Sequence, residues 1–470
     1  MINILENKRI RRNSIIFMVR NIMNVLFPLI TFKYASNVIL AEGIGAVNYS
    51  SAIIGYFSLI AQLGIYTYAC AEGTILRKNK SRFNIFFNQI LTINLISTLI
   101  SYACLFVFLS LSKNLNNYKI MILIYSVSIL CNTLGVEWLF VIYEDFIYIT
   151  LRSIIFQFIS LIFLFLFVKS KNDTVIYLII NLFATSGSYL LNFAYAKKYV
   201  HLRLVSLKSC FIHLKPILFI WISNVASLIY INADTIIIGT ILGDSAVGIY
   251  SASTKIVRAI CVPISTICTV SGPQISLAIG TSDYEKLNGL CQNVLNTLLF
   301  FALPGIVLLS LLAKTAILLI SGPTFLEGII SLKILILDIL LSPLNGFFVN
   351  QLLVPAHKEK KTMISLIIAA FFNIILDIIL IPKYGINGAA IATVVSELIV
   401  LFVCFSDIKK IIDLKIVFKD SWKFIFASLL ICLISYLLKF FDFTWSIYSF
   451  LLIVFSSIFY LGTIFFTFKK

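Results

Sequence analysis

Long apolar stretches separated by short polar connections are the feature that most constrains this chain. Residues 84–111 read "NIFFNQILTINLISTLISYACLFVFLSL" and contain no acidic or basic side chain. A helix needs about 20 mainly apolar residues to cross a bilayer, where only helices and closed barrels satisfy their backbone groups. We therefore expect about fourteen membrane-spanning helices. Their approximate positions are 14–34, 46–68, 84–111, 120–142, 146–168, 174–196, 216–242, 246–278, 290–312, 328–354, 362–381, 388–406, 421–440 and 443–467.

The composition agrees with an all-α polytopic membrane protein. Hydrophobic residues make up 60% of the 470 residues and charged residues 12%, whereas soluble domains average roughly 45–50% and about 25%. The spans leave only short connections between them, so no separate soluble catalytic domain fits in the remainder.

A short internal repeat predicts two similar halves. The segment "GIGAVNYSSA" (43–52) is echoed by "DSAVGIYSAS" (244–253), and each joins the first two helices of a block of six. The longest basic connection, about residues 197–215, separates the blocks. A parallel repeat of this kind predicts a transporter with its site between the halves. We expect a six-helix lobe at 1–200, a second at 201–410 and a two-helix hairpin at 411–470.

The net charge of +17 is distributed in bursts between the apolar stretches, which excludes a nucleic-acid-binding role. Most of the 37 Lys and Arg residues fall at the two ends and in alternate connections, with Arg152 counted among them. Since basic residues mark the cytoplasmic side, both termini are predicted to be cytoplasmic. Glu137, beside Trp138, is expected at the membrane interface.

Charged and amide side chains also interrupt the spans. They are Arg20 and Asn24 in the first span, Asn232 and Asp234 in the seventh, and Lys255 and Arg258 in the eighth. A charge at the bilayer centre costs roughly 2.5–3.5 kcal/mol, so it usually faces a wet cavity or a partner. A shared, net positive chamber would favour an anionic ligand. Two structural alternatives stay open: Arg20 could snorkel to the cytoplasmic surface, and Asp234 could pair with Lys255 or Arg258.

Two single acids, Asp377 and Glu397, lie in the eleventh and twelfth spans. Either could couple transport to a proton or sodium gradient, or could simply pack against a Lys or Asn. The nine cysteines form no Cys-x-x-Cys pair and no pattern with the three histidines, so no metal site is expected. No glycine loop for a nucleotide is present, and we expect no cofactor.

Three segments resemble the bacterial O-antigen and polysaccharide flippases, whose superfamily also holds multidrug extruders and the lipid II flippase. They are "LFPLITFKYASNVILAEGIGAVNYSSAIIGYFSLIAQLGI" (26–65), "GDSAVGIYSASTKI" (243–256) and "QLLVPAHKEKKTMISLIIAAFFNIILDIILIPKYGINGAAIATVVSE" (351–397). The chain departs from that pattern at Lys33, where Pro is expected, and at "YTYACAEGT" (66–74), where a Gly-Arg-Glu-like run is expected.

The resemblance implies a two-lobed helical bundle in the bacterial inner membrane that works by alternating access and is not an enzyme. The implied cargo is an undecaprenyl-diphosphate-linked oligosaccharide for lipopolysaccharide biosynthesis, moved from the cytoplasmic to the periplasmic leaflet, and a polysaccharide polymerase is an implied partner. From their placement, Arg20, Lys255 and Arg258 would contact the diphosphate. Asn24, Asn224 and Asn232 would contact the sugar, while the polyprenyl tail stays in membrane lipid.

Three other functions stay open. The chain could export a teichoic-type polysaccharide or a drug, although an extruder of drug cations should have an acidic chamber. A membrane polysaccharide polymerase or ligase would need a larger extracytoplasmic loop than these connections offer. A structural scaffold would not require the charges inside the spans.

Overall fold

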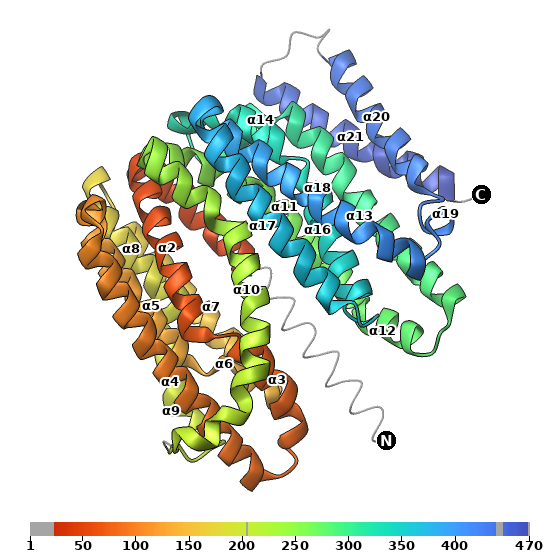
Figure 1. Cartoon of the computed structure of the whole chain (residues 1–470). Coiled ribbons are helices and arrows are strands. Elements are labelled where there is room, and N and C mark those ends of the chain that lie inside the picture. The colour runs from red at the N-terminus through yellow and green to blue at the C-terminus, as the bar shows by residue number, and fades with distance from the viewer. Residues whose placement is uncertain (1–22, 204, 439–444, 469–470) are drawn as a thin grey trace. The chain divides into compact units, whose positions relative to one another are not determined.

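A computed structural model describes residues 23–203, 205–438 and 445–468 of the chain (Figure 1). Within these ranges the chain is helical and has no strand, which confirms the predicted fold class. Eleven helical segments of the described chain are long and apolar enough to cross a membrane. The first and last predicted spans fall partly outside the described residues, so the expected total of about fourteen is not counted directly.

The chain divides into two compact units. The N-terminal unit comprises Met1–Gly239 and Gly243–Gly248, and the C-terminal unit comprises Thr240–Leu242 and Ile249–Lys470. The two units are defined by how densely their residues contact one another. The predicted two six-helix lobes and C-terminal hairpin concern membrane topology and stay a prediction.

The described part of the N-terminal unit begins with helical residues 23–38, includes most of the long helix α10 and ends with the first turn of α11. Within it, α2 packs against α4 and α5, and α3 packs against α4 and α6. The α-helices after the first are α2 (Leu40–Gln62), α3 (Ile65–Leu76), α4 (Lys80–Leu111), α5 (Lys119–Gly135), α6 (Glu137–Ile142), α7 (Phe146–Phe167), α8 (Thr174–Leu182), α9 (Tyr189–Ala196) and α10 (Leu207–Leu242).

The C-terminal unit contains most of α11 and all later helices. Its strongest pairings are α17 with α18, α20 with α21, and α13 with α20. The elements are α11 (Asp244–Val270), α12 (Gly272–Gly280), α13 (Tyr284–Leu311), α14 (Ala313–Ile320), α15 (Ile329–Leu335), α16 (Asp338–Gly346), the π-helix η5 (Phe347–Leu353), α17 (Glu359–Tyr384), α18 (Ile386–Ile411), α19 (Leu414–Val417), α20 (Ser421–Leu438) and α21 (Trp445–Phe468).

Several of the predicted spans are broken rather than continuous in the described residues, among them the span expected at 174–196, between α8 and α9, and the span at 246–278, between α11 and α12. The span expected at 46–68 breaks at Leu63 and Gly64, between α2 and α3, and the span at 120–142 breaks at Val136, between α5 and α6. The span at 328–354 consists of α15, α16 and η5. Hydropathy does not detect such breaks because the residues at them remain apolar, and irregular backbone is tolerated in a membrane where protein buries it.

The two segments of the sequence repeat lie at equivalent positions after helix breaks. Helical residues 23–38 lead into α2 through a turn at Ile39, and α10 leads into α11 through Gly243. The first turn of α11 packs closely on α2, because a Cβ atom at Gly45 would overlap the carbonyl oxygen of Asp244. Small residues allow backbones in membranes to approach this closely.

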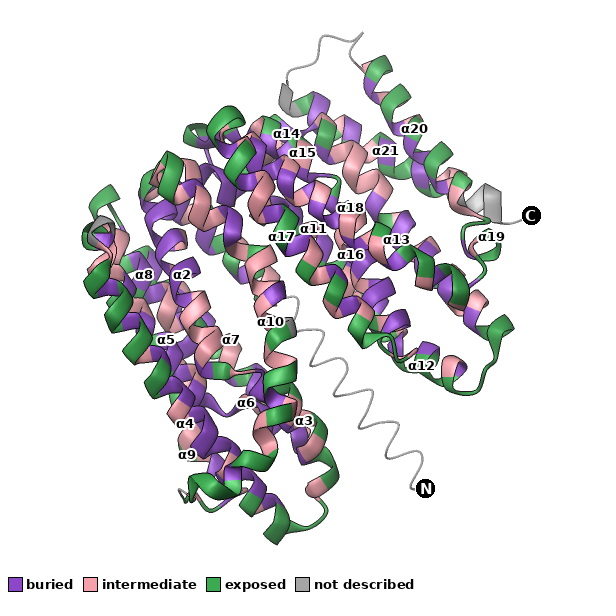
Figure 2. Ribbon diagram, in the orientation of Figure 1, coloured by how far each residue is buried: buried purple, intermediate pink, exposed green. Residues whose placement is uncertain are grey.

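Buried and exposed residues separate by helix face (Figure 2). Leu99 and Phe402 are 70% and 83% exposed, although both are strongly apolar. Exposed apolar side chains of this kind are suited to contact with lipid in a membrane-spanning chain.

The short helix α6 is fixed at its end by polar contacts. Arg77, just after α3, donates to Glu144 at 3.0 Å and also to the carbonyl oxygen of Ile142. Tyr199 Oη donates to Asp145 Oδ2 at 2.8 Å. Burial, followed by this hydrogen bond to Asp145, raises the pKa of Tyr199, so its hydroxyl remains a donor at neutral pH. These contacts hold the turn after α6 against its neighbours.

Candidate functional site

Lys255 and Arg258 lie three residues apart on α11, as the sequence indicates, and they interact electrostatically. Lys255 is half-buried and Arg258 is exposed. Cys261, the next residue on this face, contacts the main-chain oxygen of Asp338 at 3.5 Å. Arg258, Asp338 and Glu397 all act electrostatically on the Cys261 thiol. Within the C-terminal unit, Arg258 and these two carboxylates therefore lie around Cys261.

Glu397 is held by an amide. It is 8% exposed on α18, and Asn345 Nδ2 on α16 donates to its carboxylate and, at 2.9 Å, to its main-chain oxygen. This contact matches the packing alternative for Glu397. Its role in ion coupling stays a prediction.

Asp377 is fully buried on α17, one helical turn beyond the fully buried Asn373. Helix α17 packs against α18, and the hydroxyl of Thr393 on α18 lies 3.1 Å from that of Tyr250 on α11. A carboxylate and an amide oxygen at this spacing supply the hard ligands that a small cation prefers, or a site for a proton. The described residues contain no group of three or more His, Cys, Asp or Glu that could hold a metal ion.

Two predicted site residues of α10, Asn232 and Asp234, belong to the N-terminal unit and lie near α2. Trp221 Nε1 donates to the carbonyl oxygen of Leu59 at 3.0 Å, which fixes this packing. Asn232 Nδ2 lies close to Gly55, 3.8 Å from the point that a Cβ atom would occupy if Gly55 were replaced by alanine. Asp234 is 4% exposed and interacts electrostatically with Tyr56.

The remaining predicted site residues are less closely connected. Asn224 is half-buried on α10. Asn24 is exposed, and Gln157 of α7 donates to its Oδ1 at 3.2 Å. Arg20 lies outside the described residues. Because these residues and the α11 cations are distributed over two units, a common binding chamber stays a proposal.

The N-terminal unit contains a buried cation that was not predicted from the sequence. Arg152, expected in a basic connection, lies inside α7 and is only 5% exposed. Its guanidinium group lies over the rings of Tyr189, at 5.1 Å, and Tyr148, at 5.8 Å. The signal was available, since Arg152 stands six residues after the start of the expected span at 146.

A cavity in the same unit was also missed. It is lined by Gln62, Ile65, Tyr66, Asn94, Asn132, Glu137, Trp138 and Tyr189. Glu137 is therefore a half-buried lining residue, not only an interfacial anchor beside Trp138. The residues that line the cavity come from four separate spans. Their spacing along the sequence does not reveal that they lie close together.

Comparison with known proteins gives matches along most of the chain. Residues 10–278 match the family described as "Polysaccharide biosynthesis protein". The chain is 25% identical over 398 residues to the "Putative O-antigen transporter" of Escherichia coli (strain K12), covering 83% of this chain and 94% of that protein. It is 32% identical over 203 residues to the lipid II flippase MurJ of Thermosipho africanus, covering 41% and 42% of the two chains.

Solved structures share the fold at lower identity. A lipid II flippase MurJ in an inward closed conformation aligns with a TM-score of 0.79 and 19% identity, over 97% of this chain and 98% of that one. An inward-facing multidrug resistance MATE family transporter of the MOP superfamily aligns with a TM-score of 0.65 and 17% identity, over 84% and 99%.

Proposed function

We propose that this chain, which belongs to the family described as "Polysaccharide biosynthesis protein", is a multi-pass membrane flippase and moves an undecaprenyl-diphosphate-linked oligosaccharide. The resemblance recognised in the sequence is confirmed. In this proposal, an O-antigen repeat unit passes from the cytoplasmic to the periplasmic leaflet by alternating access, and both termini are cytoplasmic.

The pair of cations on α11 is the observation that supports this substrate. A diphosphate carries at least two negative charges. The free-energy cost of moving it through hydrocarbon without partners is far larger than thermal energy. Lys255 and Arg258 are next to each other on one helix face and can donate charge-assisted hydrogen bonds to phosphate oxygens. Asp338 and Glu397 act electrostatically on the same stretch of α11, at Cys261.

Of two alternative substrates, only a cationic drug is disfavoured by the same evidence. Lys255 and Arg258 would repel a cationic drug, although a multidrug transporter shares the fold. A teichoic-type carrier lipid would bind the same cations, so substrate identity must be tested directly. A polymerase partner would act after flipping and would not alter the flipping step itself.

The experiment is a flipping assay with the purified full chain in liposomes. Undecaprenyl-diphosphate-linked oligosaccharide, lipid II and a permeant cationic dye are offered separately, and movement between leaflets is followed by accessibility to an added membrane-impermeant reagent. We expect movement of the oligosaccharide lipid and none of the dye. Transport of the dye alone, or of lipid II in preference to the oligosaccharide lipid, would contradict the proposed substrate.

We further propose that Asp377 couples this movement to a proton or sodium gradient. Asp377 is fully buried on α17, one helical turn beyond the fully buried Asn373. Asp377→Asn, which removes the charge and keeps the shape, is expected to abolish stimulation by an imposed gradient while gradient-free exchange of substrate continues. Glu397→Gln is the matched comparison and should retain stimulation.

The measurement is the flipping rate with and without a proton or sodium gradient. Loss of stimulation in Glu397→Gln but not in Asp377→Asn would move the coupling role to Glu397. If the gradient still stimulates flipping in both variants as in the parent, neither acid is the coupling group.

A further inference from the structure

The cavity in the N-terminal unit is built where two broken spans meet. Its volume is about 270 Å³, and α3 and α6 pack against each other beside it. One water molecule needs only about 10–15 Å³ by this kind of measure, and small-molecule sites begin near 300 Å³. The cavity is therefore large enough for a small organic group. Its exposed lining residues, Gln62 and Tyr66, place an opening at the surface of the unit.

Both breaks hold unusual backbone. Leu63 and Gly64 have φ values of 45° and 76°, and Val136 has a φ of 33°. A β-branched residue such as Val136 is a genuine outlier in the left-handed region, and strain of this kind clusters at ligand sites. The break at Val136 is what separates α5 from α6, so that Asn132 and Glu137 on either side of it both line the cavity.

Two lining side chains carry buried polar atoms that are not satisfied. Asn94 is 6% exposed and Trp138 is 3% exposed. Among the described residues, neither Asn94 Oδ1 nor Trp138 Nε1 has a hydrogen-bond partner. A buried polar group without a partner costs roughly 1–3 kcal/mol, which a bound ligand with an acceptor and a donor would recover.

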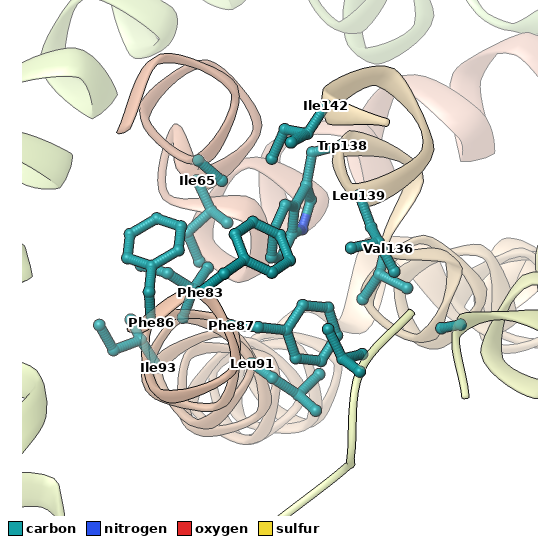
Figure 3. Close-up of a cluster of buried hydrophobic side chains, with 14 of the residues drawn as sticks. Ile65, Phe83, Phe86, Phe87, Leu91, Ile93, Val136, Trp138, Leu139 and Ile142 are labelled. Atoms are coloured by element: carbon teal, nitrogen blue, oxygen red, sulfur yellow. The ribbon is translucent and has the colours of Figure 1, made fainter. Parts of the chain in front are cut away.

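The aromatic wall of the cavity is held firmly. The Trp138 ring packs against Phe87 with ring centres 5.1 Å apart, in the buried cluster that Figure 3 shows. Tyr189 lies against Gly135, where a Cβ atom would approach its ring carbon to 2.9 Å. The Arg152 guanidinium lies over Tyr189, 5.1 Å from the ring centre. Arg152 therefore acts on the cavity as a positioning residue for Tyr189.

From this geometry we infer that the cavity is a binding site for one neutral or N-acetylated sugar unit, and this inference rests on the proposed glycan cargo. Three amides and a carboxyl group offer hydrogen bonds to hydroxyl groups, while Tyr66, Trp138 and Tyr189 offer aromatic surface to the apolar face of a sugar ring. No Lys or Arg is among the lining residues, so the cavity does not suit phosphate. A bare cation would leave most of the volume unfilled.

The test uses fluorescence of Trp138 in the purified full chain. Replacing Trp221, Trp422 and Trp445 with Phe leaves Trp138 as the single tryptophan reporter. Free galactose, N-acetylglucosamine and galacturonate are titrated separately, with sodium chloride as a fourth probe. We expect a saturable change with galactose or N-acetylglucosamine and a weaker response to galacturonate, because its carboxylate would lie near Glu137.

The lining amides provide the specificity control. In the single-tryptophan background, Asn94→Leu and Asn132→Leu are each expected to weaken sugar binding by about tenfold or more. Asn116→Leu, on an exposed asparagine that does not line the cavity, should bind as before. Circular dichroism and gel filtration check that each variant is folded.

Each outcome decides between sugar binding and other roles. No saturable response to any of the three sugars, or a response only to sodium chloride, would overturn the inference even if the protein flips its lipid-linked substrate. Sugar binding that survives both Asn94→Leu and Asn132→Leu would also overturn it. Sugar binding without flipping would leave this site in place and refute the proposed function instead.

Discussion

Gly45→Ala and Gly248→Ala are each expected to prevent accumulation of stably folded protein. A Cβ atom on Gly45 would overlap the carbonyl oxygen of Asp244, and a Cβ atom on Gly248 would overlap the carbonyl oxygen of Ala41. Both obstacles are backbone atoms, so no side chain can rotate away and a whole helix must move. Overpacking in a core typically costs 1–3 kcal/mol, and we expect a loss above about 3 kcal/mol here.

Thermal unfolding in detergent, followed by gel filtration of a fluorescent fusion, measures this effect. Gly289→Ala is the matched control, because Gly289 lies inside α13 and no atom lies within 4 Å of the position its Cβ would take. Alanine favours a helix over glycine by about 1 kcal/mol, so this control should be as stable as the parent or more so. A Gly45→Ala protein that unfolds at the temperature of the parent would show that the two segments do not pack so closely.

These glycines illustrate what could be predicted from the sequence and what could not. The echo between residues 43–52 and 244–253 marked both segments as equivalent starts of a block of helices. Their packing against each other was not predicted, because a repeat predicts similar structure and not contact. The membrane spans were predictable since about 20 apolar residues are a signal within one stretch of sequence.

The helix breaks were predictable only in part. Gly64 is a signal for a helix break, but a weak one, because an isolated glycine is also tolerated inside a helix. Val136 gave no signal, since a β-branched residue disfavours the conformation that it adopts. The polar cavity depends on both breaks and therefore could not be located from the sequence.

The sequence identified charged residues inside spans as exceptional, but it did not predict which residues contact them. Glu397 contacts Asn345, which is 52 residues distant, and Arg152 lies over the ring of Tyr189. Such pairings arise from tertiary packing between helices. The cost of an intramembrane charge identifies the residue that needs a partner, but not the partner itself.

Removing both α11 cations is expected to reduce flipping by about 100-fold or more. Lys255→Gln with Arg258→Gln keeps a polar side chain at both positions and removes both charges. Hydrogen bonds to charged groups contribute about 1.5–3 kcal/mol each, so losing two corresponds to a factor of roughly 10² to 10⁴. The flipping assay with the oligosaccharide lipid measures this loss, and gel filtration confirms that the variant is folded.

The control for this pair must separate a specific contact from a general loss of positive charge. Lys286→Gln with Lys409→Gln removes the same charge from two exposed lysines of the C-terminal unit, and flipping should be unchanged. Exchanging the pair, as Lys255→Arg with Arg258→Lys, retains both charges and should preserve most of the activity. If the Gln pair still flips the substrate at the parent rate, α11 does not bind the diphosphate. If the exposed control loses activity equally, the effect belongs to the field of the whole protein and not to this helix face.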